Sequence, residues 1–188
     1  MVALVVGTAV AAARVSPVPP LRALGATWVE VIRNTPLAVQ FVLFFFGFTK
    51  LGIQYPAFTS AIIVLGAYTS AFVAETLRSG VNSVPQGQAE AGRAIGLGFG
   101  QLLSLVVLPQ AFRTVAGPLG SVFIALIKNS SLASLISVLE LTEVADRLNT
   151  ATARPIVVFF GAACGYLLLT LPSGWAVGAI ERRVAIRR

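Results

Sequence analysis

The 188-residue chain is 56% hydrophobic, has a mean hydropathy of +0.86 and carries charges on only 11% of its residues. Soluble domains carry about 25% charged residues, so most of this chain is suited to a surrounding other than water. The absence of histidine removes the commonest general base and metal ligand, and the single Cys164 lies in an apolar run, so neither a metal site nor a disulfide is predicted. The net charge of +7 does not indicate nucleic acid binding, because the basic residues stand at the ends of apolar segments.

Long charge-free runs predict membrane-spanning helices. Residues 34–49, 57–74 and 155–180 contain no Asp, Glu, Lys or Arg. A bilayer core is crossed by roughly 20 apolar residues in a helix. Buried helices of a soluble protein would need polar outer faces, which these runs lack. The predicted fold class is therefore an all-α integral membrane protein.

The first third of the chain predicts a partial helix and a complete one. Residues 1–13 are apolar with no basic residue before them, so they read as the end of a first membrane helix with a truncated or misassigned start, not as a signal peptide. Prolines at positions 17, 19 and 20 break the backbone. Leu21 to Ile32 is expected to form an amphipathic interfacial helix or a gentle entry into the bilayer. A spanning helix then runs from about Pro36 to Gly52, capped by Asn34 and Thr35.

The remaining elements alternate between apolar and polar segments. A third helix is expected from Ala57 to Leu77, with Glu75 and Arg78 paired one turn apart. A polar interruption follows at residues 78–98, and a mixed polar segment occupies residues 128–154. Between them, apolar runs flank Arg113, and hydropathy alone does not decide which one spans. The last helix is expected from about Pro155 to Ile180.

The distribution of basic residues predicts the orientation. Cytoplasmic segments are enriched in Lys and Arg. If the C-terminus is cytoplasmic, the same side receives Arg14, Arg22, Arg33, Arg78, Arg93, Arg182, Arg183, Arg187 and Arg188, which are nine of the 14 basic residues. Lys50, Lys128, Arg147 and Arg154 fall on or near the other side. The segment "GQAEAGRAIG" is therefore predicted to be cytoplasmic.

This segment is expected to be a small helix that another protein grips, because its small residues allow close approach and Glu90 offers a charge-assisted contact. "EAGRAIG", nine residues and then "VVLP" resembles the EAA loop of ABC-importer permeases, whose pattern is E-A-A, three residues, G, nine residues, I-x-L-P. The matching positions are Glu90, Ala91, Gly96, Leu108 and Pro109. Gly92 replaces the second Ala, and Val106 replaces the Ile.

Further stretches are similar to the polar amino acid group of these permeases. They are "VIRNTPLAVQFVLFFFG", "LPQAFR" and "IALIKNSSLASLISVLEL", and together the similar segments cover most of residues 14–188. Within that group, "RVSP", "RNTPL", "FVAETLRSG" and "GLGFG" resemble glutamate-type permeases most.

The resemblance implies a single type I ABC importer transmembrane domain over residues 1–188, with about five helices. Residues 1–13 would be a partial helix 1, residues 86–109 a cytoplasmic coupling loop, and Pro109 the start of a fourth span that reaches Ile127. The implied location is the plasma membrane of a prokaryote, in contact with lipid. The implied partners are cytoplasmic ATPase subunits, a second copy or a homologous permease, and an external substrate-binding protein. This chain has no GxxxxGK[ST] run, so ATP and Mg²⁺ are expected on the partner ATPase, with no cofactor on this chain.

Intramembrane polar groups are candidates for the substrate pathway. Arg113 and Lys128 could bind a carboxylate, and Asn129, Ser130 and Ser131 could donate hydrogen bonds. Lys128 fits an interface anchor equally well, and Tyr68 and Gln40 are weaker pathway candidates.

Two alternatives stay open on the residues alone: an ion-coupled secondary carrier and a non-transporting scaffold subunit. An intramembrane enzyme is disfavoured, because no nucleophile stands with a base.

Overall fold

The computed structural model describes residues 1–184, which are helical almost throughout and contain no strand. Inside a bilayer only such a structure satisfies each backbone N–H and C=O within its own segment. The helices are α1 (Val2–Val15), α2 (Pro19–Asn34), α3 (Leu37–Val42), α4 (Phe48–Lys50), α5 (Ala57–Asn82), α6 (Gln86–Ala94), α7 (Phe99–Leu102), α8 (Leu108–Asn129), α9 (Leu141–Thr152) and α10 (Pro155–Val184). Two π-helical turns, η1 (Leu43–Gly47) and η2 (Leu103–Val107), and a 3₁₀ segment, η3 (Ser130–Ile136), connect some of them.

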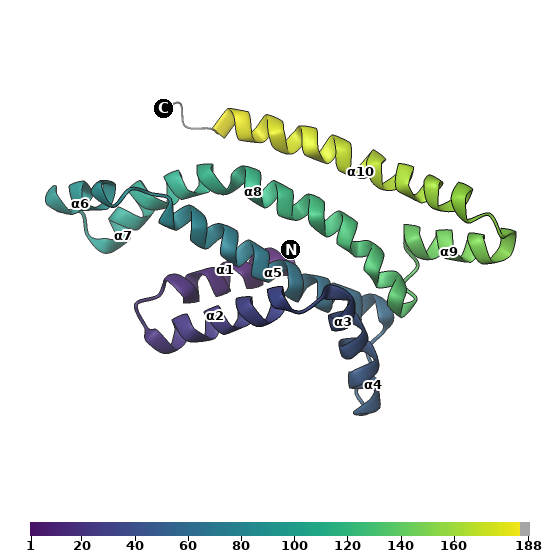
Figure 1. Ribbon diagram of the computed structural model, residues 1–188. Coiled ribbons are helices and arrows are strands. Elements are labelled where there is room, and N and C mark those ends of the chain that lie inside the picture. Colours follow the sequence, from purple (N-terminus) through teal and green to yellow (C-terminus); the bar gives the residue numbers. More distant parts are fainter. Residues whose placement is uncertain (185–188) are drawn as a thin grey trace.

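The long helices α5, α8 and α10 lie side by side, with α8 in the middle (Figure 1). Helices α1 and α2 form an antiparallel hairpin that packs on α5. We call the two ends of this arrangement the α6 end and the α9 end, after the short helices found there. Among residues 1–184, three helical stretches are long and apolar enough to cross a membrane, or up to four when the bent pair α2 and α3–α4 counts as one span. Arg187 and Arg188, which the orientation prediction counts, lie outside the described residues.

Small side chains bring these helices into close contact. A Cβ on Gly7 of α1 would lie 2.6 Å from Val73 Cγ1 and 2.8 Å from the carbonyl oxygen of Ser70, so only glycine fits there. Ala71 and Ala74 on the same face of α5 are fully buried. Close packing of this kind holds membrane helices together where hydrophobic burial gives little net drive. The α1–α5 contact is therefore one of the tightest parts of the molecule.

A second packed region lies toward the α9 end, where α3 and η3 meet the first half of α5. Phe41 of α3 is fully buried there among Val64, Ala133 and Ile136. The π turn η1 follows directly, and Phe44 and Phe45 extend the apolar contact. This cluster fixes where α3 sits after the chain turns away from α2.

The helix predicted from about Pro36 to Gly52 forms over Leu37–Lys50, but this stretch is long enough to span only together with α2. The segment before it, predicted as an interfacial helix or a gentle entry into the bilayer, packs against other helices. Helix α2 packs on α1 and α5 with Val29 only 1% exposed, so it belongs to the bundle. The chain then bends by 103° between α2 and the α3–α4 stretch. Pro36 explains the bend, because it has no N–H to continue the helical ladder.

Three polar side chains stabilise this bend by donating hydrogen bonds to backbone carbonyl groups at the end of α2. Asn34 and Thr35 cap α2 and not the following helix: Asn34 Nδ2 donates to the Glu30 carbonyl at 2.8 Å, and Thr35 Oγ1 donates to the Val31 carbonyl at 2.8 Å. Gln40 Nε2 donates to the carbonyls of Ile32 and Thr35 at 2.9 and 3.0 Å. Gln40 thus has a structural role that the sequence did not reveal. A broken helix inside a membrane requires such replacement of lost backbone hydrogen bonds.

The fourth spanning element also differs from its prediction. A continuous helical stretch of 38 residues runs from Phe99 to Ile136, so the helix begins ten positions before Pro109. The π turn η2 immediately precedes Leu108 and Pro109. A wider turn accommodates a proline that would otherwise collide with the preceding carbonyls. Residues 97–109 are therefore largely part of this helix and do not simply complete a loop.

Candidate functional site

Helix α6 forms as predicted over the EAA-like motif, and Gly96 ends it. Gly96 has a φ of +86°, a conformation that favours glycine. Its N–H donates to the Arg93 carbonyl at 3.0 Å, and the Leu97 N–H donates to the Gly92 carbonyl at 3.1 Å. These two bonds are the Schellman arrangement of a helix C-terminus. The conformational demand at this position explains why the motif requires glycine there.

The two faces of α6 have different surroundings. Gly92 is buried, and a Cβ there would lie 2.6 Å from Leu102 Cδ1, so this face rests on the start of the Phe99–Ile136 helix. Glu90, Ala91 and Arg93 on the other face are exposed. Glu90 makes no ion pair with any residue in the range 1–184. The structure thus brings Glu90 and Ala91 together on one open surface and assigns Gly92 and Gly96 to its support.

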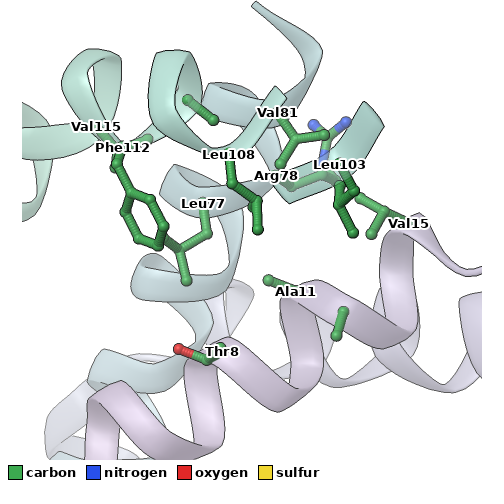
Figure 2. A pocket seen from close by; sticks show the side chains of 12 residues that line it. Thr8, Ala11, Val15, Leu77, Arg78, Val81, Leu103, Leu108, Phe112 and Val115 are labelled. Atoms are coloured by element: carbon green, nitrogen blue, oxygen red, sulfur yellow. The ribbon is translucent and has the colours of Figure 1, made fainter. Parts of the chain in front are cut away.

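Leu108 and Pro109, which the resemblance grouped with Glu90, lie elsewhere. Leu108 lines an apolar cavity of about 280 Å³ (Figure 2). The cavity is partly open and lies between α1, α5, η2 and α8. Its lining residues are Thr8, Ala11, Ala12, Val15, Leu77, Arg78, Val81, Leu103, Leu108, Ala111, Phe112 and Val115. Leu108 therefore contributes to helix packing near the α6 end and not to the exposed face of α6.

An ion network borders this cavity. The predicted pairing of Glu75 with Arg78 is confirmed, and Glu75 also accepts from Arg14, which comes from α1. Arg14 is far away in the sequence, so only the packing of α1 on α5 reveals its contribution. The network links the end of α1, through Arg14, to the two turns of α5 that carry Glu75 and Arg78.

The predicted pathway residues do not form one site. Arg113 stands in the second turn of α8 and Lys128 near its other end, about 22 Å apart at 1.5 Å per residue. Both side chains are exposed. The Ser130 and Ser131 hydroxyls donate to the carbonyls of Ile127 and Lys128 at 2.7 Å each, which stabilises η3.

Asn129 and Tyr68 are the two pathway candidates that the structure brings together. Both line a cavity of about 170 Å³ between α5 and α8. The other lining residues are Thr69, Phe72, Val122, Ala125 and Leu126. The cavity combines an apolar wall with a phenol, a hydroxyl and an amide, a mixture typical of small-molecule sites.

Sequence reasoning missed one charged residue near this cavity. Arg33, which the orientation prediction placed with the cytoplasmic basic residues, lies with its guanidinium carbon 5.2 Å from the ring centre of Phe72. Phe72 falls inside the charge-free run 57–74 of α5. The sequence held one signal for this position. If the helix that contains Arg22 continues up to Pro36, Arg33 lies on the same face as Arg22 but farther along the helix.

Comparison with known proteins identifies the family. Residues 3–186 match the family described as the binding-protein-dependent transport system inner membrane component. The chain belongs to this family of ABC importer membrane subunits.

Curated relatives narrow the likeness to amino acid permeases. The probable glutamine ABC transporter permease protein GlnM of Bacillus subtilis is 39% identical to this chain, and the alignment covers 96% of this chain and 83% of GlnM. The glutamate transport system permease protein GluC of Corynebacterium glutamicum is 40% identical, with 99% and 87% covered. The L-cystine transport system permease protein TcyB of Bacillus subtilis is 39% identical, with 93% and 75% covered. The resemblance to permease subunits of amino acid ABC importers is thereby confirmed.

Solved structures agree on the fold. A crystal structure of an amino acid ABC transporter with histidines superimposes with a TM-score of 0.92 at 33% identity, covering 97% of this chain and 85% of that one. The MetNI methionine ABC transporter in an inward-facing conformation gives a TM-score of 0.78 at 20% identity, covering 98% and 86%. The predicted fold class, an all-α integral membrane protein of the type I importer kind, is confirmed.

Proposed function

We propose that this chain forms half of the membrane pathway of an ATP-driven importer for a polar amino acid, with glutamate as the first substrate to test. The three named relatives are described as permeases for glutamine, glutamate and L-cystine. All three compounds are amino acids with a carboxylate and an ammonium group, so a common recognition site is chemically reasonable.

This proposal rests on the observation that the two faces of α6 differ, one being packed and the other exposed. One face is held on Leu102, while Glu90, Ala91 and Arg93 are exposed on the other. A separate cytoplasmic ATPase with bound ATP and Mg²⁺ would dock on this open face, and Glu90 would accept from a basic residue of the ATPase. The basic residues Arg78, Arg93, Arg182 and Arg183 at the α6 end support a cytoplasmic location for it.

The mechanism that follows is alternating access between two such halves. A second copy or a homologous permease supplies the other half, and an external binding protein delivers the amino acid at the α9 end. Closure of two ATPase subunits on ATP draws the two α6 helices together. Because α6 rests on Leu102 at the start of the Phe99–Ile136 helix, its displacement moves that helix and opens the pathway outward. Hydrolysis then returns the helices to the inward-open state.

Copurification of the ATPase from detergent extracts tests the docking surface. The tagged chain is expected to retain the ATPase, and Glu90→Arg is expected to lose most of it. Gly96→Asp should lose it as well, because a side chain at φ +86° distorts the end of α6. Asp146→Arg, which makes the same acid-to-base change on exposed α9 at the opposite end, serves as the matched control. Retention of the ATPase by Glu90→Arg would refute docking at α6.

Uptake into proteoliposomes tests the driving force and the substrate. Labelled glutamate should accumulate only with ATP, and replacement of the ATPase's P-loop lysine should abolish the signal. Unlabelled glutamine and L-cystine, added as competitors, rank the candidate substrates. Uptake that persists with the inactive ATPase would instead indicate an ion-coupled carrier, and the absence of uptake of any of the three would favour a scaffold subunit.

A further inference from the structure

Arg33 is an exposed cation of this chain that lies far along α2, at the level of the charge-free part of α5. From Pro19 to Arg33, α2 rises about 21 Å at 1.5 Å per residue, starting from the α6 end. The guanidinium carbon then lies 5.2 Å from the ring centre of Phe72, within the charge-free run 57–74. An arginine at such a depth is costly unless it has a functional partner or faces a water-filled path.

No carboxylate in the described range 1–184 forms an ion pair with Arg33. Glu30, one turn earlier on α2, accepts from Asn34 Nδ2 at 3.1 Å. Glu75, one turn after Phe72 on α5, already accepts from both Arg14 and Arg78. The aromatic ring stabilises the cation, but it leaves the planar set of N–H donors of the guanidinium available to a carboxylate.

The position of Arg33 is fixed by the packing of α2 on α5. The indole N–H of Trp28 donates to the Ser70 hydroxyl at 3.1 Å, and Ser70 is fully buried. Val29 on the next position is 1% exposed against the same helices. Helix α2 ends immediately afterwards at the 103° bend, whose carbonyls are held by Gln40. Arg33 therefore stands on a rigid support at the end of a broken helix, which is where many membrane transporters place their binding groups.

Phe72 connects Arg33 to the 170 Å³ cavity between α5 and α8. The ring that carries the guanidinium also lines this cavity, together with Tyr68, Thr69 and Asn129. A cation and a small pocket with polar side chains thus meet at one aromatic ring. That combination matches a zwitterionic molecule, with the carboxylate at the cation and the remaining groups toward the pocket.

We propose that Arg33 binds the carboxylate of the transported amino acid, while Tyr68, Thr69 and Asn129 receive the rest of the molecule. This assignment rests on the proposed importer function and names the substrate-binding residues for it. It replaces Arg113 and Lys128 as carboxylate partners, because Arg33 is the one of these three cations whose guanidinium packs on a ring that lines the cavity. Phe72 acts as a positioning residue for the guanidinium.

The experiment uses the complete permease–ATPase complex in detergent, without the external binding protein, and measures the Kd for the labelled amino acid in Arg33→Gln, Arg33→Lys and the matched control Arg22→Gln. Arg22 lies three helical turns before Arg33 on the same face of α2, is exposed, and forms no ion pair within residues 1–184. Arg33→Gln is expected to raise this Kd about tenfold or more, since a bidentate charged contact is lost. Arg33→Lys should recover part of this loss, and Arg22→Gln should keep the wild-type Kd.

A second readout separates recognition of the carboxylate from a merely structural role. Competition by the amino acid is compared with competition by its α-carboxamide, which lacks the negative charge. The wild type should favour the acid by at least about tenfold, and Arg33→Gln should compete equally well with both. A structural role would weaken both competitors alike and keep their ratio.

The outcomes distinguish this inference from the proposed function. ATP-dependent uptake by the wild type, together with an unchanged Kd and an unchanged acid-to-amide ratio in Arg33→Gln, would overturn the carboxylate assignment and leave the importer function intact. A lower yield of folded complex, with an unchanged ratio, would also overturn it and make Arg33 a structural residue. Absence of ATP-dependent amino acid uptake by the wild type would overturn the proposed function and this inference with it.

Discussion

Arg14 and Glu75, which lie 61 positions apart in the sequence, form an ion pair that ties the end of α1 to α5. Glu75 also binds Arg78, so one carboxylate holds two guanidinium groups at the α6 end. The side chains are only 14% and 27% exposed for Arg14 and Glu75. Such a partly buried network is more sensitive to the loss of one member than an exposed pair.

Glu75→Gln should therefore destabilise the molecule. The substitution keeps the size of the side chain but leaves two cations beside a neutral amide. Loss of the charge-assisted bonds is expected to cost about 1.5–3 kcal/mol, seen as a lower apparent Tm of the detergent-solubilised protein. Arg147→Gln is the control, because Arg147 is 60% exposed in its pair with Glu143 and its removal should cost only about 0.3–0.5 kcal/mol. Equal effects of the two substitutions would contradict this view of the network.

The contact between Trp28 and Ser70 should be worth about one hydrogen bond. Trp28→Phe keeps the ring in place but removes the N–H that donates to Ser70 Oγ at 3.1 Å. Ser70→Ala removes the acceptor and also the bond from Ser70 to the Ala67 carbonyl. A double-mutant cycle on the apparent free energy of unfolding should give a coupling of about 1 kcal/mol. A coupling near zero would mean that shape alone holds α2 on α5.

The sequence predicted the membrane class, the helix over the EAA-like motif and the Glu75–Arg78 pair, because each depends on a local pattern. Hydropathy and short-range spacing are local quantities. The interfacial alternative for α2 differs from the structure because amphipathic character is shared by interfacial helices and by helices that pack in a bundle with one polar face. The residues next to Arg14 in the sequence do not indicate its ion pair with Glu75, and those next to Arg33 do not indicate its contact with Phe72. Those contacts follow only from how α1 and α2 pack on α5.

The pathway candidates Ser130 and Ser131 have a local role that the sequence does not show. Ser130 and Ser131 are polar residues in an apolar stretch, which marks them as candidates, but their hydroxyls bind backbone carbonyls one turn earlier. Serine commonly satisfies itself in this way within helical segments. Sequence alone does not distinguish a hydroxyl that is free for a ligand from one used to stabilise a 3₁₀ segment. Asn129 has the same kind of signal and differs only because it lines a cavity.

The two glycines of the coupling loop should respond differently to alanine. At Gly92 a methyl group would meet Leu102 Cδ1 at 2.6 Å, which is the mobile end of a side chain, and the EAA pattern has alanine at this position. Gly92→Ala should therefore change the apparent Tm and ATPase copurification little. Gly96→Ala places a Cβ at φ +86° and should cost about 1–2 kcal/mol of local stability. Hydrogen exchange of residues 86–97 measures this, and faster exchange in Gly92→Ala than in Gly96→Ala would contradict the prediction.

Glu140 should control the stability of α9 at the other end of the bundle. Its carboxylate accepts from the N–H groups of Thr142 and Glu143 at 2.8 and 2.7 Å and from the Tyr166 hydroxyl at 2.7 Å. It therefore caps α9 and joins it to α10 at once. Glu140→Ala removes all three bonds and should destabilise α9 by about 1–2 kcal/mol.

Hydrogen exchange across residues 141–152 measures the effect, and Tyr166→Phe provides the matched comparison because it removes only the link to α10. Faster exchange in Glu140→Ala than in Tyr166→Phe is expected, since the helix cap is lost only in the former. If the two variants exchange at the same rate, the link to α10 and not the cap holds α9 in place. Because the proposed function places α9 on the side where a binding protein arrives, both variants should then be assayed for uptake, with Glu140→Ala the slower of the two.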